Sequence, residues 1–137
     1  MRDDLQVLVI DDQPSMQMLL SMSLRSMGIR GVSTAADGVE ALDAMRRKTP
    51  DLVLLDMEMP RMGGVETLRA IREDAALRHL PVIVVTGLAD AGVVKETQAL
   101  GVSGYLIKPL SADTLKTRIK ALTFPQRAVV ELDVKSP

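Results

Sequence analysis

Acidic residues stand directly after two apolar runs of this sequence. Asp11 and Asp12 follow the run Gln6–Ile10, and Asp56 follows the run Leu52–Leu55. A carboxylate at the end of a buried strand is costly to desolvate unless it is paired or bound to a cation. Two such carboxylates about 4 Å apart repel each other by roughly 4 kcal/mol at an effective dielectric constant of about 20. A hard divalent cation relieves that repulsion, so the acids predict a Mg²⁺ site.

A hydroxyl and an ammonium follow two further apolar runs. Thr86 comes after Val82–Val85, and Lys108 comes after Tyr105–Ile107. Phosphoryl transfer needs charge neutralisation and in-line placement of the reacting groups, with little covalent help from the protein. A Mg²⁺ ion, the Lys108 ammonium, the Thr86 hydroxyl and backbone amides would supply this. Asp56 would then be the nucleophile and would form an acyl phosphate.

These side chains can meet only if the apolar runs form neighbouring strands of one sheet. The first, third and fourth runs are nearly continuous Val, Ile and Leu, which is typical of central strands of a parallel sheet. Helical patterns separate the runs. The predicted strands are Gln6–Ile10, Val32–Ala36, Leu52–Leu55, Val82–Val85 and Tyr105–Ile107. The predicted helices are Met16–Met27, Gly38–Lys48, Val65–Arg72, Ala91–Leu100 and Ser111–Leu122.

Strict alternation of strands and helices with short loops predicts an α/β open sheet. The usual solution is a flavodoxin-like, doubly wound parallel sheet of five strands in the order 2-1-3-4-5, with five helices. In that order the first and third strands are neighbours, and ligands bind at the carboxyl ends of the strands. The acids, the hydroxyl and the ammonium are therefore expected at one edge of the sheet.

Local signals indicate where several helices begin and end. Asp37 and Asp90 each stand where a helix needs an N-cap, and Gly101 suits the position after a helix C-terminus. The second helix is expected to turn one apolar stripe toward the sheet. Its members are Val39, Leu42 and Met45.

Composition restricts the class of protein. The chain has 137 residues, 47% hydrophobic and 26% charged, with a formal net charge of −1. This balance gives no electrostatic case for nucleic acid or an anionic membrane surface, and no apolar run approaches the length of a membrane span. Because the chain has no Cys, a cytoplasmic location is expected. One domain over residues 1–122 is expected, followed by a tail over 123–137 that is either a mobile terminus or an extra edge strand at Val129–Val134.

Four motifs resemble, in order and spacing, the signatures of the receiver domain of two-component response regulators. They are "VLVIDD", "VLLDMEMPRMGG", "VIVVTG" and "GYLIKP", and the likeness spans about residues 5–122. The short chain is most similar to the single-domain, chemotaxis-type (CheY-like) regulators. The resemblance implies a phosphoprotein switch that accepts a phosphoryl group on Asp56. Such a switch is not an enzyme acting on other substrates; it catalyses only its own phosphorylation and dephosphorylation.

The resemblance also implies which residues hold the Mg²⁺ ion. Asp12 would bind it directly, Asp11 mostly through water, and Asp56 by its carboxylate. The backbone carbonyl of Glu58 would complete the protein ligands. Glu58 itself departs from the best-known members, which often carry an amide there, and it is expected to tune the phosphoryl lifetime together with Leu88.

The remaining roles concern phosphate contact and switching. By the resemblance, Lys108 would pair with the phosphate, and Thr86 would hydrogen-bond to it. The resemblance also implies a cis Lys108–Pro109 bond. Tyr105 would swing inward and remodel the surface of the fourth helix, fifth strand and fifth helix. A downstream protein effector is expected to dock on that surface, whose candidate contact residues are Val102, Tyr105 and Lys116.

The phosphodonor is expected to be another protein. His79, the single histidine, precedes the fourth strand and so belongs to the opposite end of the sheet. A histidine kinase or a histidine phosphotransfer protein would therefore supply the phosphoryl group. A Met-rich first helix is a candidate contact face for such a partner, and core filling is its simpler explanation.

Three other functions compete with the switch. A phosphate sink would use the same chemistry without an effector. A Mg²⁺-dependent phosphatase with an aspartyl-phosphate intermediate is kept open by Glu58, since such enzymes carry a second acid two residues after the nucleophile. A nucleotide- or flavin-binding module is disfavoured because no Gly-rich loop follows the first strand and the acids there would repel a phosphate.

Overall fold

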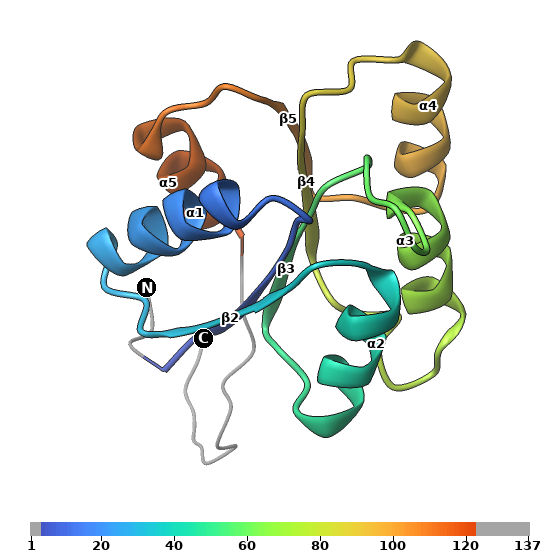
Figure 1. Ribbon diagram of the computed structural model, residues 1–137, viewed down its shortest axis with the longest axis horizontal. Helices are drawn as coiled ribbons and strands as arrows, with labels where there is room; N and C mark the ends of the chain where they lie inside the picture. The colour runs from blue at the N-terminus through green and yellow to red at the C-terminus, as the bar shows by residue number, and fades with distance from the viewer. Residues whose placement is uncertain (1–3, 123–137) are drawn as a thin grey trace, which may run out of the picture.

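The computed structural model describes residues 4–122, in which strands and helices alternate (Figure 1). The strands are β1 (Gln6–Ile10), β2 (Gly31–Ala35), β3 (Leu52–Leu55), β4 (Val82–Thr86) and β5 (Gly104–Ile107). The helices are α1 (Pro14–Ser26), α2 (Gly38–Arg47), α3 (Gly64–Glu73), α4 (Ala91–Ala99) and α5 (Ala112–Lys120). The expected tail at 123–137, with its alternative edge strand, lies outside the described residues.

The sheet has the predicted doubly wound topology. Its strand order is β2-β1-β3-β4-β5, and every neighbouring pair is parallel. Helices α1 and α5 cover one face, and α2, α3 and α4 cover the other (Figure 1). The flavodoxin-like fold with five strands and five helices is thus confirmed over residues 4–122, and element boundaries differ from the predicted ones by only one or two residues at most ends.

Both faces of the sheet are buried, as the continuous apolar runs predicted. In β1, Val7 and Val9 belong to the core beneath α1 and α5, whereas Leu8 and Ile10 belong to the core beneath α2 and α3. This is the two-residue alternation of a strand, with apolar side chains on both faces. The central strands are therefore held rigidly, and so are the residues at their ends.

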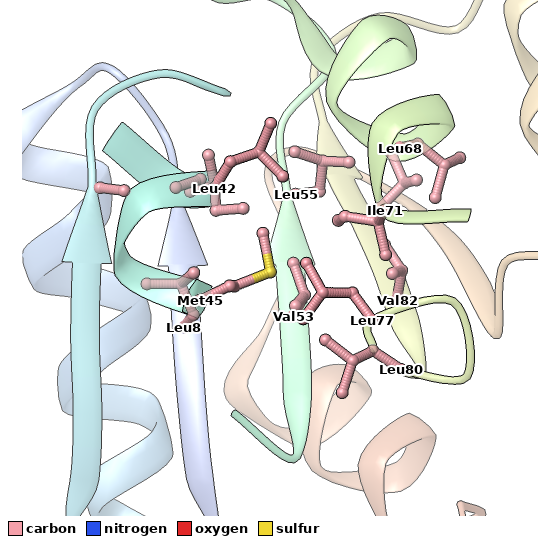
Figure 2. Packing of buried hydrophobic residues seen from close by; sticks show 14 of the residues in the cluster. Leu8, Leu42, Met45, Val53, Leu55, Leu68, Ile71, Leu77, Leu80 and Val82 are labelled. Atoms are coloured by element: carbon pink, nitrogen blue, oxygen red, sulfur yellow. The ribbon is translucent and has the colours of Figure 1, made fainter. Parts of the chain in front are cut away.

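Helices α2 and α3 pack on one face of the sheet through short apolar stripes. Figure 2 shows Leu42 and Met45 of α2 and Leu68 and Ile71 of α3 directed at the strand that carries Val53. Met45, Leu68 and Ile71 have no exposed surface. Full burial of such a side chain contributes roughly 1.5–3 kcal/mol each, so these contacts fix the helices on the sheet.

The apolar stripe predicted for α2 included one residue, Val39, that does not face the sheet. Val39 is 49% exposed, whereas the buried residues of α2 are Gly38, Ala41, Leu42 and Met45. These four share one helical face, and Val39 is rotated from Gly38 by about 100°. The first turn of α2 buries a glycine because it lies against the loop before α3, where a Cβ on Gly38 would overlap Met62 and Thr67.

Helix ends follow the predicted signals. Asp37 Oδ1 accepts the Glu40 N–H at 2.9 Å, and Asp90 Oδ1 accepts the Val93 N–H at 3.0 Å. Gly101 has φ +84°, as expected for the residue that reverses the chain after a helix. The Lys108–Pro109 bond is cis, as expected. Within residues 4–122, no helix combines the length and apolar character that crossing a bilayer requires.

Candidate functional site

The candidate site lies at the carboxyl ends of β1, β3, β4 and β5. Ile10 of β1 pairs in register with Leu55 of β3, so the residues that follow them begin at the same level of the sheet. These are Asp11 and Asp56, which are 0% and 4% exposed, while Asp12 beside them is exposed. Parallel pairing thus brings together carboxylates that are far apart in the sequence.

Three carboxylates converge, as the topology predicted. One oxygen from each of Asp11, Asp12 and Asp56 lies within 4.8 Å of the others. Lys108 Nζ is 2.7 Å from Asp11 Oδ2 and 3.5 Å from Asp56 Oδ2. One ammonium against three carboxylates leaves an excess of two negative charges. An all-oxygen donor set with that excess fits a hard divalent cation such as Mg²⁺.

Lys108 remains charged in this setting. Its side chain is 15% exposed, and burial opposes its charged form. Hydrogen bonding to Asp11 and the charge of Asp56 outweigh that burial, so the pKa of Lys108 is raised above its ordinary value. A fixed cation therefore stands beside Asp56 at neutral pH, where it can neutralise an incoming anion.

Asp56 is held by donors on its other oxygen. Thr86 Oγ1 donates to Asp56 Oδ1 at 2.6 Å, and the Glu58 N–H donates to the same oxygen at 3.1 Å. Thr86 Oγ1 in turn lies 3.3 Å from the Leu88 N–H, which donates to it. These bonds compensate the cost of burying a carboxylate and leave Asp56 Oδ2 facing Lys108.

The acids open into a solvent-accessible pocket of about 410 Å³. It is lined by Asp12, Gln13, Asp56, Glu58, Gly87 and Lys108. Glu58 and Gln13 are exposed at its mouth. The pocket is polar and open to solvent, and Asp56 lies in its lining.

Tyr105 is linked to the loop after β4. Its hydroxyl donates to the Leu88 carbonyl at 2.6 Å, and the side chain is half-buried. Burial raises the pKa of Tyr105, and the negative charges of Asp90, Asp56 and Glu58 add to the effect. Hydrogen bonds thus run from Asp56 through Thr86 to Leu88 and on to Tyr105.

Residues set aside from the sequence lie outside this constellation. Asp37 and Asp90 cap helices, as predicted. His79 is exposed and lies three residues before the first residue of β4, so it belongs to the sheet end opposite the acids.

The sequence did not predict two residues that contact the surroundings of the site. Gln17 Nε2 donates to the Asp11 carbonyl at 2.7 Å, and Arg61 binds Asp37 beside the loop that follows β3. Arg61 stands inside the quoted motif, but its partner is 24 residues away, and no periodicity connects the two residues.

Residues 7–120 match the family model of the response regulator receiver domain. The chain belongs to the response regulator receiver family. This receiver is 36% identical over 118 residues to the chemotaxis protein CheY of Pseudomonas aeruginosa, a match that covers 86% of this chain and 95% of that one. It is 35% identical over 116 residues to the chemotaxis protein CheY-3 of Vibrio cholerae, covering 85% of this chain and 89% of the relative.

Solved structures give the same family likeness. The receiver superposes on the chemotaxis protein CheY4 of Vibrio cholerae with a TM-score of 0.81 and 31% identity, covering 88% of this chain and 99% of that one. A CheY-like receiver domain protein of Methanospirillum hungatei gives a TM-score of 0.80 at 25% identity, covering 86% of this chain and 92% of that one. The receiver family comprises signalling switches. Its chemotaxis members are among the relatives of this chain.

Proposed function

We propose that this receiver is the response regulator of a two-component pathway that accepts a phosphoryl group on Asp56. The observation that carries the proposal is the setting of Asp56, which is buried between the Thr86 hydroxyl and the Lys108 ammonium and lies beside Asp12. A donor phosphohistidine on a histidine kinase or a histidine phosphotransfer protein supplies the group.

The residues around Asp56 divide the work of binding a cation. Asp12, Asp56 and the Glu58 backbone carbonyl would hold Mg²⁺. Asp11 would act mostly through water, because its oxygens already accept from the Gln13 N–H at 2.9 Å and from Lys108 at 2.7 Å. When bound, the cation neutralises the carboxylates and the phosphoryl oxygens, so that one anion can approach another.

The transfer itself is a displacement at phosphorus. A carboxylate oxygen of Asp56 forms a bond to phosphorus, the bond from phosphorus to the donor imidazole nitrogen breaks, and that nitrogen keeps the electron pair. Lys108 neutralises a phosphoryl oxygen during the displacement. Thr86 redirects its hydroxyl from Asp56 to the new phosphoryl oxygens, since these carry the larger negative charge.

Movement of Thr86 would reach the partner-binding surface through Leu88 and Tyr105. The Leu88 amide contacts Thr86, and its carbonyl accepts from Tyr105. Phosphorylation then shifts the populations of two arrangements of α4, β5 and α5. A downstream protein effector reads that surface, with Val102, Tyr105 and Lys116 as its contacts.

Phosphorylation with a small donor tests the assignment. Wild type incubated with Mg²⁺ and radiolabelled acetyl phosphate should acquire an acid-stable, base-labile label, and Asp56→Asn should acquire none. Asp90→Asn is the matched control, because Asp90 is an acid that caps α4 and does not line the pocket that contains Asp56; it should label like wild type. Labelling of Asp56→Asn at the wild-type level would overturn the proposal.

The relatives support a proposal for the pathway. The Pseudomonas and Vibrio relatives are chemotaxis proteins by name, and we extend that pathway, and a cytoplasmic location, to this chain. A phosphate sink shares the chemistry but has no effector. A protein retained only by the beryllofluoride-treated form supports the switch, and the absence of any such protein supports the sink.

Glu58 favours one enzymatic alternative. It is a second acid two residues after Asp56 and lines the same pocket, as in Mg²⁺-dependent phosphatases with an aspartyl-phosphate intermediate. Multiple turnover of small phosphate esters, abolished by Glu58→Gln, would support the phosphatase. The switch predicts at most one phosphoryl group taken up per chain before slow hydrolysis.

A further inference from the structure

An ion pair joins the loop after β3 to the beginning of α2. Arg61 donates to Asp37 Oδ2 from Nε at 2.9 Å, and its terminal nitrogen lies 2.7 Å from the same oxygen. The Asp37 side chain is 8% exposed. Its other oxygen caps α2 through the Glu40 N–H. One carboxylate oxygen of Asp37 therefore binds the loop after β3, and the other caps α2.

The loop and α2 are also in direct backbone contact. The Gly38 N–H donates to the Met62 carbonyl at 3.2 Å, and a Cβ on Gly38 would overlap Met62 and Thr67. Thr67 Oγ1 donates to the Gly63 carbonyl at 2.8 Å. The loop thus has no room to move toward α2, and Arg61 opposes movement away from it.

The same loop forms one wall of the phosphoacceptor site. Its Glu58 N–H donates to Asp56 Oδ1 at 3.1 Å, and its Glu58 carbonyl is a proposed cation ligand. Met62 has φ +51°, a left-handed conformation that a residue other than Gly rarely adopts. A loop with such a turn keeps its shape only if its surroundings hold it.

We propose that Arg61 and Asp37 are a positioning pair that holds residues 57–63, and with them the Glu58 carbonyl, in the geometry that binds Mg²⁺. This inference rests on the proposed function. It adds two residues outside the acid cluster to the determinants of cation affinity. Neither residue lines the pocket that contains Asp56.

The sign of the effect separates positioning from simple charge. Arg61 is a cation, so by charge alone its removal strengthens Mg²⁺ binding, and removal of the Asp37 charge weakens it. Positioning predicts weaker binding in both cases. The pKa of Asp37 is lowered by the backbone hydrogen bond from Glu40 and, to a smaller degree, by Arg61, so the pair is ionised at neutral pH.

Calorimetric titration with MgCl₂ tests the pair. Arg61→Ala should raise the Kd for Mg²⁺ by about threefold to tenfold, at or below the lower end of the usual effect of outer-shell partners. Arg61→Lys keeps the charge and loses one donor of the pair, so its Kd should lie between those of wild type and Arg61→Ala. Asp37→Asn keeps an oxygen for the α2 cap, and the double variant Arg61→Ala/Asp37→Asn should match Arg61→Ala because the two residues act as one unit.

A matched control and a metal-free measurement complete the experiment. Arg47→Ala removes an exposed ion pair within α2, in which Arg47 lies 3.3 Å from Asp43. This variant should leave the Kd for Mg²⁺ unchanged. Without Mg²⁺, hydrogen exchange at the Glu58 amide should be faster in Arg61→Ala than in wild type and Arg47→Ala. If Arg61→Ala is poorly folded by circular dichroism, Arg61→Lys and Asp37→Asn provide the same comparison.

The outcomes separate failure of the positioning pair from failure of the proposed phosphoacceptor function. Wild type that fails to bind Mg²⁺ overturns the proposed function and this inference together. Wild type that binds Mg²⁺ while Arg61→Ala binds it equally or more tightly overturns only the positioning pair. A double variant whose Kd returns to the wild-type value would show that Arg61 and Asp37 act as opposing point charges, which also rejects it.

Discussion

The two carboxylate oxygens of Asp56 have different neighbours. Oδ1 accepts from Thr86 at 2.6 Å and from the Glu58 amide at 3.1 Å, while Oδ2 lies 3.5 Å from Lys108 Nζ. Lys108 itself is closer to Asp11, at 2.7 Å. We therefore expect Oδ2 to be the nucleophile, because it gives up the weaker of these contacts when a bond to phosphorus forms.

At the residue scale, Tyr105 gives a direct spectroscopic prediction. The chain has one Tyr and no Trp, so tyrosinate absorbance reports Tyr105 alone. Because burial raises its pKa from 10.0, the native midpoint should lie above pH 10, and unfolded protein in urea should titrate near 10. A native midpoint at or below the unfolded one would contradict the burial of Tyr105 beside the negative charges of Asp90, Asp56 and Glu58.

The raised pKa of Tyr105 also implies how the free energy of unfolding depends on pH. The folded state keeps the Tyr105 proton to a higher pH than the unfolded state, so the contribution is fully present below the unfolded pKa. It is lost as pH rises from about 10 through the folded value. The free energy of unfolding of wild type should therefore fall more steeply than that of Tyr105→Phe in this window.

At the scale of elements, α3 lacks the side-chain cap that α2, α4 and α5 possess. Its N-cap is Gly63, with φ −69° and ψ −177°, which any residue can adopt. A Cβ there would lie 3.7 Å from the Met57 carbonyl oxygen, an ordinary contact. The missing cap makes α3 a place where a single substitution can add stability.

We predict that Gly63→Ser stabilises the protein by about 0.5–1 kcal/mol, through a cap bond and a less flexible unfolded chain. Gly64→Ser is the control on the neighbouring residue. Its Cβ would lie 2.5 Å from the Asp56 carbonyl oxygen, so it should destabilise by roughly 1–3 kcal/mol. Urea denaturation measures both, and equal effects of the two substitutions would refute the assigned cap position.

The corrected face of α2 gives a second prediction at this scale. Met45 has no exposed surface and Val39 is 49% exposed. Met45→Ala should cost about 2–5 kcal/mol by leaving a cavity, whereas Val39→Ala should change the free energy of unfolding by less than about 0.5 kcal/mol. Thermal and urea unfolding of the two variants checks this, and a large loss in Val39→Ala would restore the original stripe.

Across the whole molecule, the two ends of α4 are held differently. Arg72 of α3 donates to the carbonyls of Leu100 at 2.8 Å and Gly101 at 2.6 Å, at the C-terminal end of α4. It also donates to the Leu80 carbonyl at 2.9 Å. The N-terminal end of α4 follows the loop that contains Leu88, whose N–H donates to Thr86 Oγ1. An anchor at the C-terminal end of α4 favours motion at this N-terminal end.

Cation binding should stabilise the whole fold by mass action. Mg²⁺ at about 100 times its Kd should raise the free energy of unfolding by about 2.7 kcal/mol, because only the folded state gathers the three carboxylates. Asp12→Asn should lose most of this increment without a large change in metal-free stability, since Asp12 is exposed. Thermal unfolding with and without MgCl₂ tests this, and an equal increment in Asp12→Asn would place the cation elsewhere.

The sequence by itself determined the architecture and the composition of the site. Hydrophobic periodicity is local, so the continuous Val, Ile and Leu runs identified central strands, and parallel topology then placed Asp11, Asp56, Thr86 and Lys108 at one edge. Only the tertiary structure decided the pairings, such as Arg61 with Asp37 and Tyr105 with Leu88, and the exposure of Val39. These depend on how loops and helices approach in space, and residues 24 or 17 positions apart carry no periodic signal that links them.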